Sequence, residues 1–306
     1  MIEITATSTV TTVHGVSIVI PAYNEENGIE LVLEQITEIL RTTGLTHEVI
    51  VVDDGSTDRT SEILEKRDDI RLLRHAQNQG YGAALKTSIR HARYDLICIT
   101  DADGTYPNEV IPQLLQRTIE DDLDMLVGAR TGNHVKIPWV RKPAKWAIGK
   151  LANYVVGERI PDINSGLRVF KRSVALLFFP MLPSGFSFTT TITLGMLING
   201  FRVAYMPIDY HGRIGNSKIR PIHDTLNFVN LISRIGLYFA PLKIFMPFSA
   251  LLFTLGLTWG IFSHLALGRL ADTSMLVVMM ASIQVALLGL VAEVINHRVP
   301  NVHRKE

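Results

Sequence analysis

A chain of 306 residues is long enough for two domains of ordinary size. Its 30 basic and 29 acidic residues leave a formal net charge of +1, which excludes binding of nucleic acid through bulk charge. Hydrophobic residues make up 47% of the chain and the mean hydropathy is +0.22, so we expect part of the protein to contact lipid. Cys98 is the single cysteine, which excludes an intramolecular disulfide and a metal cluster held by thiolates.

Residues 1–15 are expected to form a flexible N-terminal tail. They are rich in threonine and lack both the basic start and the apolar core of a signal peptide. A regular pattern of strands and helices begins at Val16.

Residues 16–127 alternate short β-branched runs with helical patterns. This order predicts an α/β fold with a doubly wound, mostly parallel sheet, in which ligands bind beyond the carboxyl ends of the strands. The expected strands are Val16–Ile20, Glu48–Val52, Ile70–Leu73, Leu96–Thr100 and Met125–Val127, and the expected helices are Glu25–Arg41, Asp58–Arg67, Tyr81–Ala92 and Asn108–Glu120.

Polar side chains follow three of these strands. After the first come residues 21–25 with Tyr23 and Glu25, and after the second comes the run 52–58 with two adjacent aspartates. Carboxylates and an aromatic ring at neighbouring strand ends suit a nucleoside. The alternative is that Asn24 and Ser56 or Thr57 only cap the following helices.

The fourth strand ends in two aspartates, Asp101 and Asp103, followed by Gly104. Residues i and i+2 of an extended segment point to one side, so both carboxylates can face one ligand. Oxygen ligands suit Mg²⁺ or Mn²⁺, and such a cation neutralises a diphosphate, so a nucleotide diphosphate is the expected substrate. An ordinary turn is the alternative interpretation.

After Arg130 the pattern is less regular, apart from a strand-like Leu167–Phe170. We interpret this part as the acceptor side of one catalytic domain that covers residues 16–221. Residues 222–243 follow with apolar side chains on one helical face, which predicts an amphipathic helix in the membrane interface or, equally, one packed on the domain.

Residues 244–296 are expected to form two membrane-spanning helices. Ile244–Leu267 and Ser274–Ala292 carry no Asp, Glu, Lys or Arg, and the first run would extend roughly 36 Å as a helix. A buried hairpin of a soluble protein is the alternative. Basic residues flank the pair on the outer sides more than in the link, so the catalytic domain and the tail 297–306 are expected on the cytoplasmic side.

Taken in order, several motifs make the chain similar to family 2 glycosyltransferases with the GT-A fold. With the C-terminal hairpin, it resembles the polyprenyl-phosphate branch, of the dolichyl-phosphate mannose synthase and polyprenyl-phosphate glucosyltransferase type. The motifs are Pro21-Ala22-Tyr23-Asn24-Glu25, Val52-Asp53-Asp54-Gly55-Ser56, Asn78-Gln79-Gly80-Tyr81-Gly82-Ala83-Ala84, Asp101-Ala102-Asp103-Gly104, Asn164-Ser165-Gly166-Leu167-Arg168 and Arg213-Ile214-Gly215-Asn216-Ser217-Lys218.

The resemblance implies a role for each matching residue. Asp101 and Asp103 would hold the metal, and Asp162 would align the acceptor or act as a weak base. The nucleotide would contact Pro21, Tyr23, Glu25, Asp54, Lys86, Asp101, Ala102 and Asp103; the acceptor phosphate would contact Arg130, Arg168, Arg213, Ser217 and Lys218; and the catalytic set would be Asp101, Asp103, Asp162, Arg130 and Arg213.

The implied activity is inverting, metal-dependent transfer of a sugar at the cytoplasmic membrane face. The donor would be a nucleotide-diphosphate sugar, and the acceptor would be a polyprenyl phosphate, either undecaprenyl or dolichyl phosphate. Mannose synthases of this type often carry Gln where this chain has Thr105, so we favour a UDP-sugar over GDP-mannose. Two rivals stay open: a membrane glycosyltransferase that acts on a saccharide or glycolipid hydroxyl, and a nucleotide-binding scaffold without turnover. A homo-oligomer is also left open.

Overall fold

The computed structural model describes residues 15–131, 149–150, 152–210, 236–237, 240–268 and 273–298. These residues form two compact units. The first takes in 15–131, 164–188 and 203–210, and the second takes in 149–163, 189–202 and the C-terminal helices, so the expected catalytic domain of residues 16–221 is divided between them. Most of the expected juxtamembrane helix, along with the N-terminal and C-terminal tails, lies outside the described residues.

A seven-stranded sheet forms the centre of the first unit, in the order β3-β2-β1-β4-β6-β5-β7. All strands pair in parallel except β6, which runs antiparallel to both β4 and β5. The strands are β1 (Val16–Ala22), β2 (His47–Asp53), β3 (Arg71–Arg74), β4 (Leu96–Ile99), β5 (Met125–Ala129), β6 (Arg168–Lys171) and β7 (Val203–Pro207). The predicted mostly parallel sheet is confirmed.

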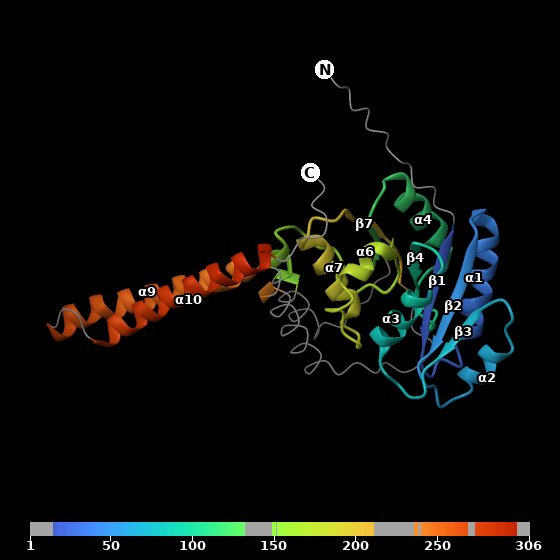
Figure 1. The fold of residues 1–306 in the computed structure, drawn as a ribbon, viewed down its shortest axis with the longest axis horizontal. Helices are drawn as coiled ribbons and strands as arrows, with labels where there is room; N and C mark the ends of the chain where they lie inside the picture. The colour runs from blue at the N-terminus through green and yellow to red at the C-terminus, as the bar shows by residue number, and fades with distance from the viewer. Residues whose placement is uncertain are drawn as a thin grey trace, which may run out of the picture. The chain divides into compact units, whose positions relative to one another are not determined.

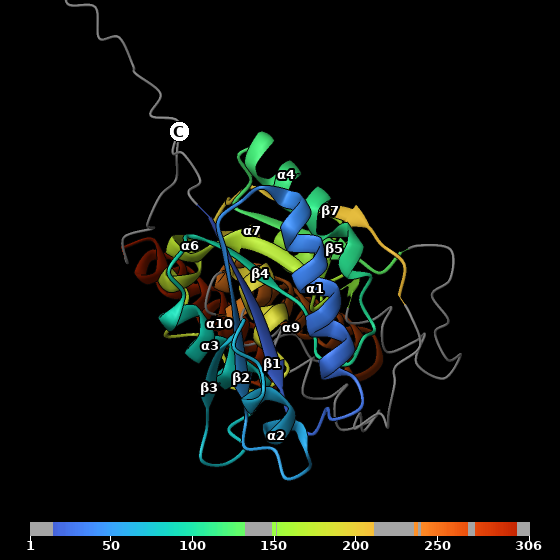
Figure 2. The ribbon, with the colours of Figure 1, turned by 90° about the vertical axis from the view of Figure 1, so that its right-hand side faces the viewer.

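Helices cover both faces of this sheet. Figure 1 shows α1 on one side of β1 and β2 and α3 on the other, and Figure 2 shows α1 lying along the strands with α4 beside it. The helices of this unit are α1 (Ile29–Thr43), α2 (Thr60–Glu65), α3 (Tyr81–His91), the 3-10 turn η1 (Asn108–Val110), α4 (Ile111–Glu120) and α6 (Arg172–Leu177). The four helices expected within residues 16–127 are present, with ends shifted by a few residues.

Alternation along the strands builds the core on each face. On β1, Ile18 and Ile20 pack with apolar residues of α1 and α4, while Val19, which is also fully buried, points to the opposite face. This pattern requires strands that are apolar on both sides, as the sequence of β1 is. Cys98 lies inside β4, where burial raises the pKa of its thiol to about 12 and keeps it protonated.

Two long helices, α9 (Pro241–Leu267) and α10 (Thr273–Arg298), form a hairpin in the second unit (Figure 1). Both are long and apolar enough to cross a membrane, and most of their large side chains are exposed. The helix α9 begins at Pro241, so residues 241–243 belong to it and not to the preceding amphipathic segment. This unit also contains most of α7 (Phe188–Ile198).

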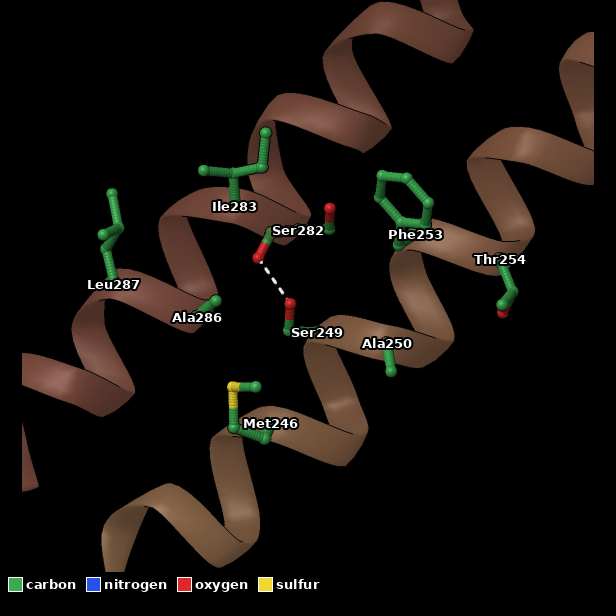
Figure 3. A pocket seen from close by; sticks show the side chains of 9 residues that line it. All are labelled: Met246, Ser249, Ala250, Phe253, Thr254, Ser282, Ile283, Ala286 and Leu287. Carbon is green, nitrogen blue, oxygen red and sulfur yellow. Dashed lines mark hydrogen bonds between the residues drawn. The ribbon is translucent and has the colours of Figure 1, made fainter.

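Small residues line the contact between α9 and α10. On α9, Ser249, Gly256 and Ser263 are buried and recur every seven residues. On α10, Ser282 and Gly289 are buried, and the Ser249 hydroxyl donates a hydrogen bond of 2.7 Å to the carbonyl oxygen of Ser282 beside a shallow apolar groove (Figure 3). Small side chains allow close backbone approach, which is how helices associate in lipid.

Substitution of Gly289 tests this packing. A Cβ atom on Gly289 would lie 2.6 Å from the Cβ of Phe245, so Gly289→Leu must separate the helices. We expect it to destabilise the hairpin by about 1–3 kcal/mol, measured as a lower midpoint of thermal unfolding in detergent. The control is Val291→Leu, because Val291 is 56% exposed on the same helix. Equal midpoints for both variants would contradict the contact.

Candidate active site

The carboxyl ends of β1, β2 and β4 meet at one edge of the sheet. Because β1 lies between β2 and β4, the strand order reverses here, and open α/β sheets bind ligands at such a point. Pro21 and Ala22 end β1, and Asp101 follows β4 by two residues. The two motifs assigned to nucleoside and metal are thus brought to the same edge, as predicted.

The loops after β1 and β2 are joined by paired hydrogen bonds. The backbone N–H of Asn24 donates to the Ser56 hydroxyl at 3.0 Å, and that of Thr57 donates to Asn24 Oδ1 at 2.8 Å. The N-cap residues of α1 and α2 are Gly28 and Arg59, and neither makes a side-chain cap hydrogen bond, so the alternative that Asn24 and Ser56 or Thr57 only cap these helices does not hold. Their side chains instead hold the two loops together.

A second set of hydrogen bonds extends this connection. The Glu25 N–H donates to Thr60 Oγ1 at 2.9 Å, and the Glu26 N–H donates to Asp58 Oδ2 at 3.2 Å. Burial opposes ionisation of Asp58, but the hydrogen bonds from Thr60 and Glu26 outweigh it and lower the pKa of this carboxyl. The backbone that carries Tyr23 and Glu25, two predicted nucleotide contacts, is therefore fixed before any ligand binds.

Asp54 is almost fully buried and accepts three hydrogen bonds from the protein. Its Oδ1 accepts from His75 Nδ1 at 2.6 Å and from the Gln79 N–H at 2.9 Å, and its Oδ2 accepts from the Gly80 N–H at 2.8 Å. The other ring nitrogen of His75 lies 2.9 Å from Thr87 Oγ1. Asp54 thus joins the end of β2 to the start of α3, a structural role beside its predicted contact with the nucleotide.

Asp101 is enclosed by two groups that the sequence motifs include but that were assigned no role. The Tyr81 hydroxyl donates to Asp101 Oδ1 at 2.9 Å. A Cβ atom on Gly166 would lie 2.8 Å from Asp101 Oδ2 and 3.0 Å from Oδ1. Burial and the nearby carboxylate hold the pKa of Tyr81 well above its usual value, so its hydroxyl remains a donor.

Asp103 is 8% exposed and is held by the residue two positions later. Its Oδ1 accepts from Thr105 Oγ1 at 2.6 Å and from the Thr105 N–H at 3.1 Å. Thr105 is fully buried, at the position where the similar mannose synthases often carry Gln. Its hydroxyl orients the neighbouring carboxylate.

A group of aromatic residues links Gly166 to Arg130. The Gly166 N–H donates to the Tyr106 hydroxyl at 2.6 Å, and the ring of Tyr106 meets the edge of Tyr210 at 5.4 Å between centroids. The Arg130 guanidinium lies 5.3 Å from the centroid of Tyr210. Burial, followed by the charge of Asp101, raises the pKa of Tyr106, so this hydroxyl also stays protonated. Arg130 is the predicted phosphate ligand that the structure places in this group.

Arg168, predicted to bind the acceptor phosphate, is fully buried on β6. Its Nε donates to the Ser165 carbonyl oxygen at 3.2 Å, and Nη2 donates to the same oxygen. Ser165 is held in turn, because its hydroxyl donates to the Gly128 carbonyl oxygen at 2.5 Å. A guanidinium without exposed surface has no direct path to a phosphate in this structure. Its position suits support of the 164–166 turn, which differs from the predicted role.

The remaining predicted residues are distributed more widely. Lys86 is part-buried on α3, where burial followed by the charge of Arg90 lowers the pKa of its amine. Ala102 is buried beside Asp101, and Asp162 is buried in the second unit. Arg213, Ser217 and Lys218 lie outside the described residues.

Tyr81, Tyr106 and His75 were not predicted to belong to the site. Of these three residues, Tyr81 could have been identified from the sequence. It lies between two glycines at the predicted start of a helix, close to the strand end that carries the site. His75 and Tyr106 stand outside any motif. Their contacts depend on strand pairing, which places residues distant in sequence side by side.

The donor set fits a divalent cation. Asp101 and Asp103 supply carboxylate oxygens, the preferred ligands of Mg²⁺ and Mn²⁺. The lack of a side chain on Gly166 keeps the space next to Asp101 open. The described residues include no group of three or more Asp, Glu, His or Cys side chains that could hold a metal ion, so the fit rests on these two carboxylates.

Residues 17–177, just over half of the chain, match the family described as Glycosyl transferase family 2. The chain belongs to this glycosyltransferase family. Residues 240–297 match a second family, described as GtrB C-terminal hairpin. The chain is therefore a glycosyltransferase, and the predicted family, the GT-A fold and the C-terminal hairpin are confirmed.

Two curated relatives are similar to the glycosyltransferase. It is 31% identical over 206 residues to Dolichyl-phosphate hexose transferase of Haloferax volcanii. The matched region covers 67% of this chain and 86% of that protein. It is 33% identical over 186 residues to Undecaprenyl-phosphate 4-deoxy-4-formamido-L-arabinose transferase of Pseudomonas paraeruginosa, covering 56% of this chain. The chain spans about half of the second relative, 54% of its length.

Among solved structures, the chain is similar to glucosyl-3-phosphoglycerate synthase from Mycobacterium tuberculosis. The TM-score is 0.58 at 20% sequence identity, and the likeness covers 73% of this chain and 78% of the other. At this level of identity the likeness supports the fold of the sheet unit and no more.

Substitution of Asp54 distinguishes a structural anchor from a nucleotide contact. An amide at this position keeps one acceptor oxygen for three donors, so Asp54→Asn leaves buried N–H groups unsatisfied. We expect a loss of about 1–3 kcal/mol in the free energy of unfolding, measured by thermal or denaturant unfolding. Unchanged stability with weaker nucleotide binding would favour the contact alone.

Gly166→Ala tests the space beside Asp101. The added methyl group would displace the carboxylate or the turn that faces it, so we expect kcat/KM for sugar transfer to fall by at least about tenfold. The matched control is Gly149→Ala, because a Cβ atom there meets nothing within 4 Å. Equal activity of the two variants would show that the close approach does not matter.

Proposed function

We propose that this glycosyltransferase moves one sugar from a nucleotide-diphosphate sugar to a polyprenyl phosphate. The observation that carries the proposal is the combination of two features in one chain. The catalytic sequence is similar to transferases named for dolichyl phosphate and undecaprenyl phosphate, and the helical hairpin follows it further along the same chain. A lipid acceptor gives the hairpin a purpose, since it holds the catalytic unit at the surface that contains the acceptor.

A UDP-sugar is the favoured donor, with GDP-mannose as the alternative. Thr105 replaces the Gln that is frequent in mannose synthases. The solved structure with a similar fold is of a complex with Mn²⁺, UDP and phosphoglyceric acid, and we extend the pairing of a divalent cation with UDP to this chain as part of the proposal. Tyr23, Glu25 and Asp54 are proposed to contact the nucleoside, along with Pro21, Lys86 and Ala102.

Asp101 and Asp103 would hold Mg²⁺ or Mn²⁺, which when bound acts as a Lewis acid on the diphosphate. In the transfer, a phosphate oxygen of the acceptor attacks the anomeric carbon, the bond from that carbon to the diphosphate oxygen breaks, and the nucleoside diphosphate leaves with the electron pair. Attack from the opposite side inverts the anomeric configuration. Both carboxylates must therefore keep one orientation throughout the step.

A strong general base is not needed for this attack. A phosphate monoester has a second pKa of about 6 and is largely dianionic at neutral pH. Asp162 is therefore proposed to align the acceptor or act as a weak base. Arginine and lysine suit the phosphate, and the proposed ligands are Arg130, Arg213, Ser217 and Lys218, whereas the buried Arg168 is proposed to act only through the 164–166 turn.

The catalytic unit is proposed to face the cytoplasm. Arg298 is the last residue of the second apolar helix and Arg304 and Lys305 follow it, whereas the link between the helices holds one basic residue, Arg269. Basic residues are retained on the cytoplasmic side of membrane proteins. Nucleotide sugars would then reach the site from the cytoplasm.

The proposal is tested with purified full-length protein, labelled nucleotide sugars and two acceptors, undecaprenyl phosphate and a saccharide panel. Transfer to the lipid phosphate with at least one UDP-sugar is the expected result. Label on the saccharides alone would overturn the lipid acceptor and favour a hydroxyl acceptor. Nucleotide binding without transfer to any acceptor would favour a scaffold.

Substitution of Asp103 tests whether this residue is a metal ligand. Asp103→Ala removes one of the two proposed metal ligands, so we expect turnover to fall by about 100-fold or more and UDP binding to lose its dependence on Mn²⁺. Glu109→Ala is the control, since Glu109 is an exposed acidic residue near the same strand end. Unchanged turnover in the Asp103 variant would remove this residue from the mechanism.

A further inference from the structure

We propose that Tyr81 is a positioning residue that fixes the carboxylate of Asp101 for the metal. This inference rests on the proposed function and adds to it a group that contacts neither substrate nor metal. The juxtaposition that supports it is direct: the Tyr81 hydroxyl donates to Asp101 Oδ1 at 2.9 Å. A carboxylate that can rotate presents its oxygens in many directions, whereas one held at Oδ1 presents Oδ2 in a defined one.

The backbone on the N-terminal side of Tyr81 is anchored. Gly80 has φ 102°, a conformation that favours glycine, and its N–H donates to Asp54 Oδ2 at 2.8 Å. Asp54 is fixed in turn by His75 at 2.6 Å. The helix α3 therefore starts at a defined place, and Tyr81 is its first residue.

The segment 183–186 holds Tyr81 from the other side. The Ala83 N–H donates to the Ser184 carbonyl oxygen at 3.0 Å. The ring of Phe186 stacks on the ring of Tyr81, with centroids 5.6 Å apart and planes inclined by 18°. With its backbone anchored and one ring face covered, Tyr81 has little freedom to move its hydroxyl away from Asp101.

Packing alone does not account for this tyrosine. Phe186, which covers one face of its ring, is 74% exposed, so the stacking contact lies at the surface of the unit. A phenylalanine at position 81 would keep the same stacking. The property specific to tyrosine is the hydroxyl, and its hydrogen-bond partner is the proposed metal ligand.

Tyr81→Phe isolates the hydroxyl. We expect Mn²⁺, titrated in the presence of UDP and followed by electron paramagnetic resonance of the free ion, to bind about tenfold more weakly than to wild type. We also expect kcat to fall, while the KM for undecaprenyl phosphate stays unchanged. Tyr94→Phe is the control, because Tyr94 lies at the opposite end of the strands, before β4.

The outcomes separate this inference from the function on which it rests. Wild-type affinity for Mn²⁺ and wild-type kcat in the Tyr81→Phe variant would overturn the positioning role while leaving the function intact. Wild-type protein that transfers sugar to no lipid phosphate would overturn the function instead. If the Phe variant loses stability, Phe186→Ala serves as the second variant, since it releases the ring but keeps the hydroxyl: weaker Mn²⁺ binding supports the proposal and unchanged binding overturns it.

Discussion

Two carboxylates of like charge, Asp101 and Asp103, follow one buried strand and must be held in a fixed orientation. Asp103 is almost fully buried and Asp101 is part-buried, and like charges repel more strongly where solvent screens them less. Each carboxylate accepts a hydrogen bond from a hydroxyl group: Asp101 from Tyr81 and Asp103 from Thr105. A cation held by both carboxylates would offset their like charge, as the proposed metal site requires.

The surrounding loops extend this arrangement to the rest of the edge. Asn24 joins the loops after β1 and β2, and Asp54 joins β2 to α3. Each connection uses a short polar side chain that accepts hydrogen bonds from backbone N–H groups, which regular strands and helices leave unpaired at their ends. These hydrogen bonds order the strand-end loops at which the nucleotide is proposed to bind, so less binding energy would be needed to order them.

The sheet was predictable because each strand is a short β-branched run between helical patterns, and the run 16–22 is apolar on both faces. The antiparallel direction of β6 was not, since Arg168 to Lys171 reads the same in either direction. Burial of Arg168 was not predicted, because a charged side chain is expected to be exposed unless a buried partner is known. One such partner is the carbonyl oxygen of Ser165, which the sequence does not reveal. The sequence predicted two apolar helices. It did not indicate that Ser249, Gly256 and Ser263, spaced by seven residues, form the surface of one helix that contacts the other.

Thr105 bears on how donor and metal combine in the proposed reaction. A Gln at this position would offer a third side-chain ligand, whereas the Thr105 hydroxyl donates to Asp103. In the proposed site Asp101 and Asp103 would supply the carboxylate ligands, and Mg²⁺ commonly completes such a sphere with phosphate oxygens and water. A site of this kind binds metal weakly alone and more tightly with the nucleotide. Metal affinity and donor affinity are then coupled by linkage, and each strengthens the other by the same factor.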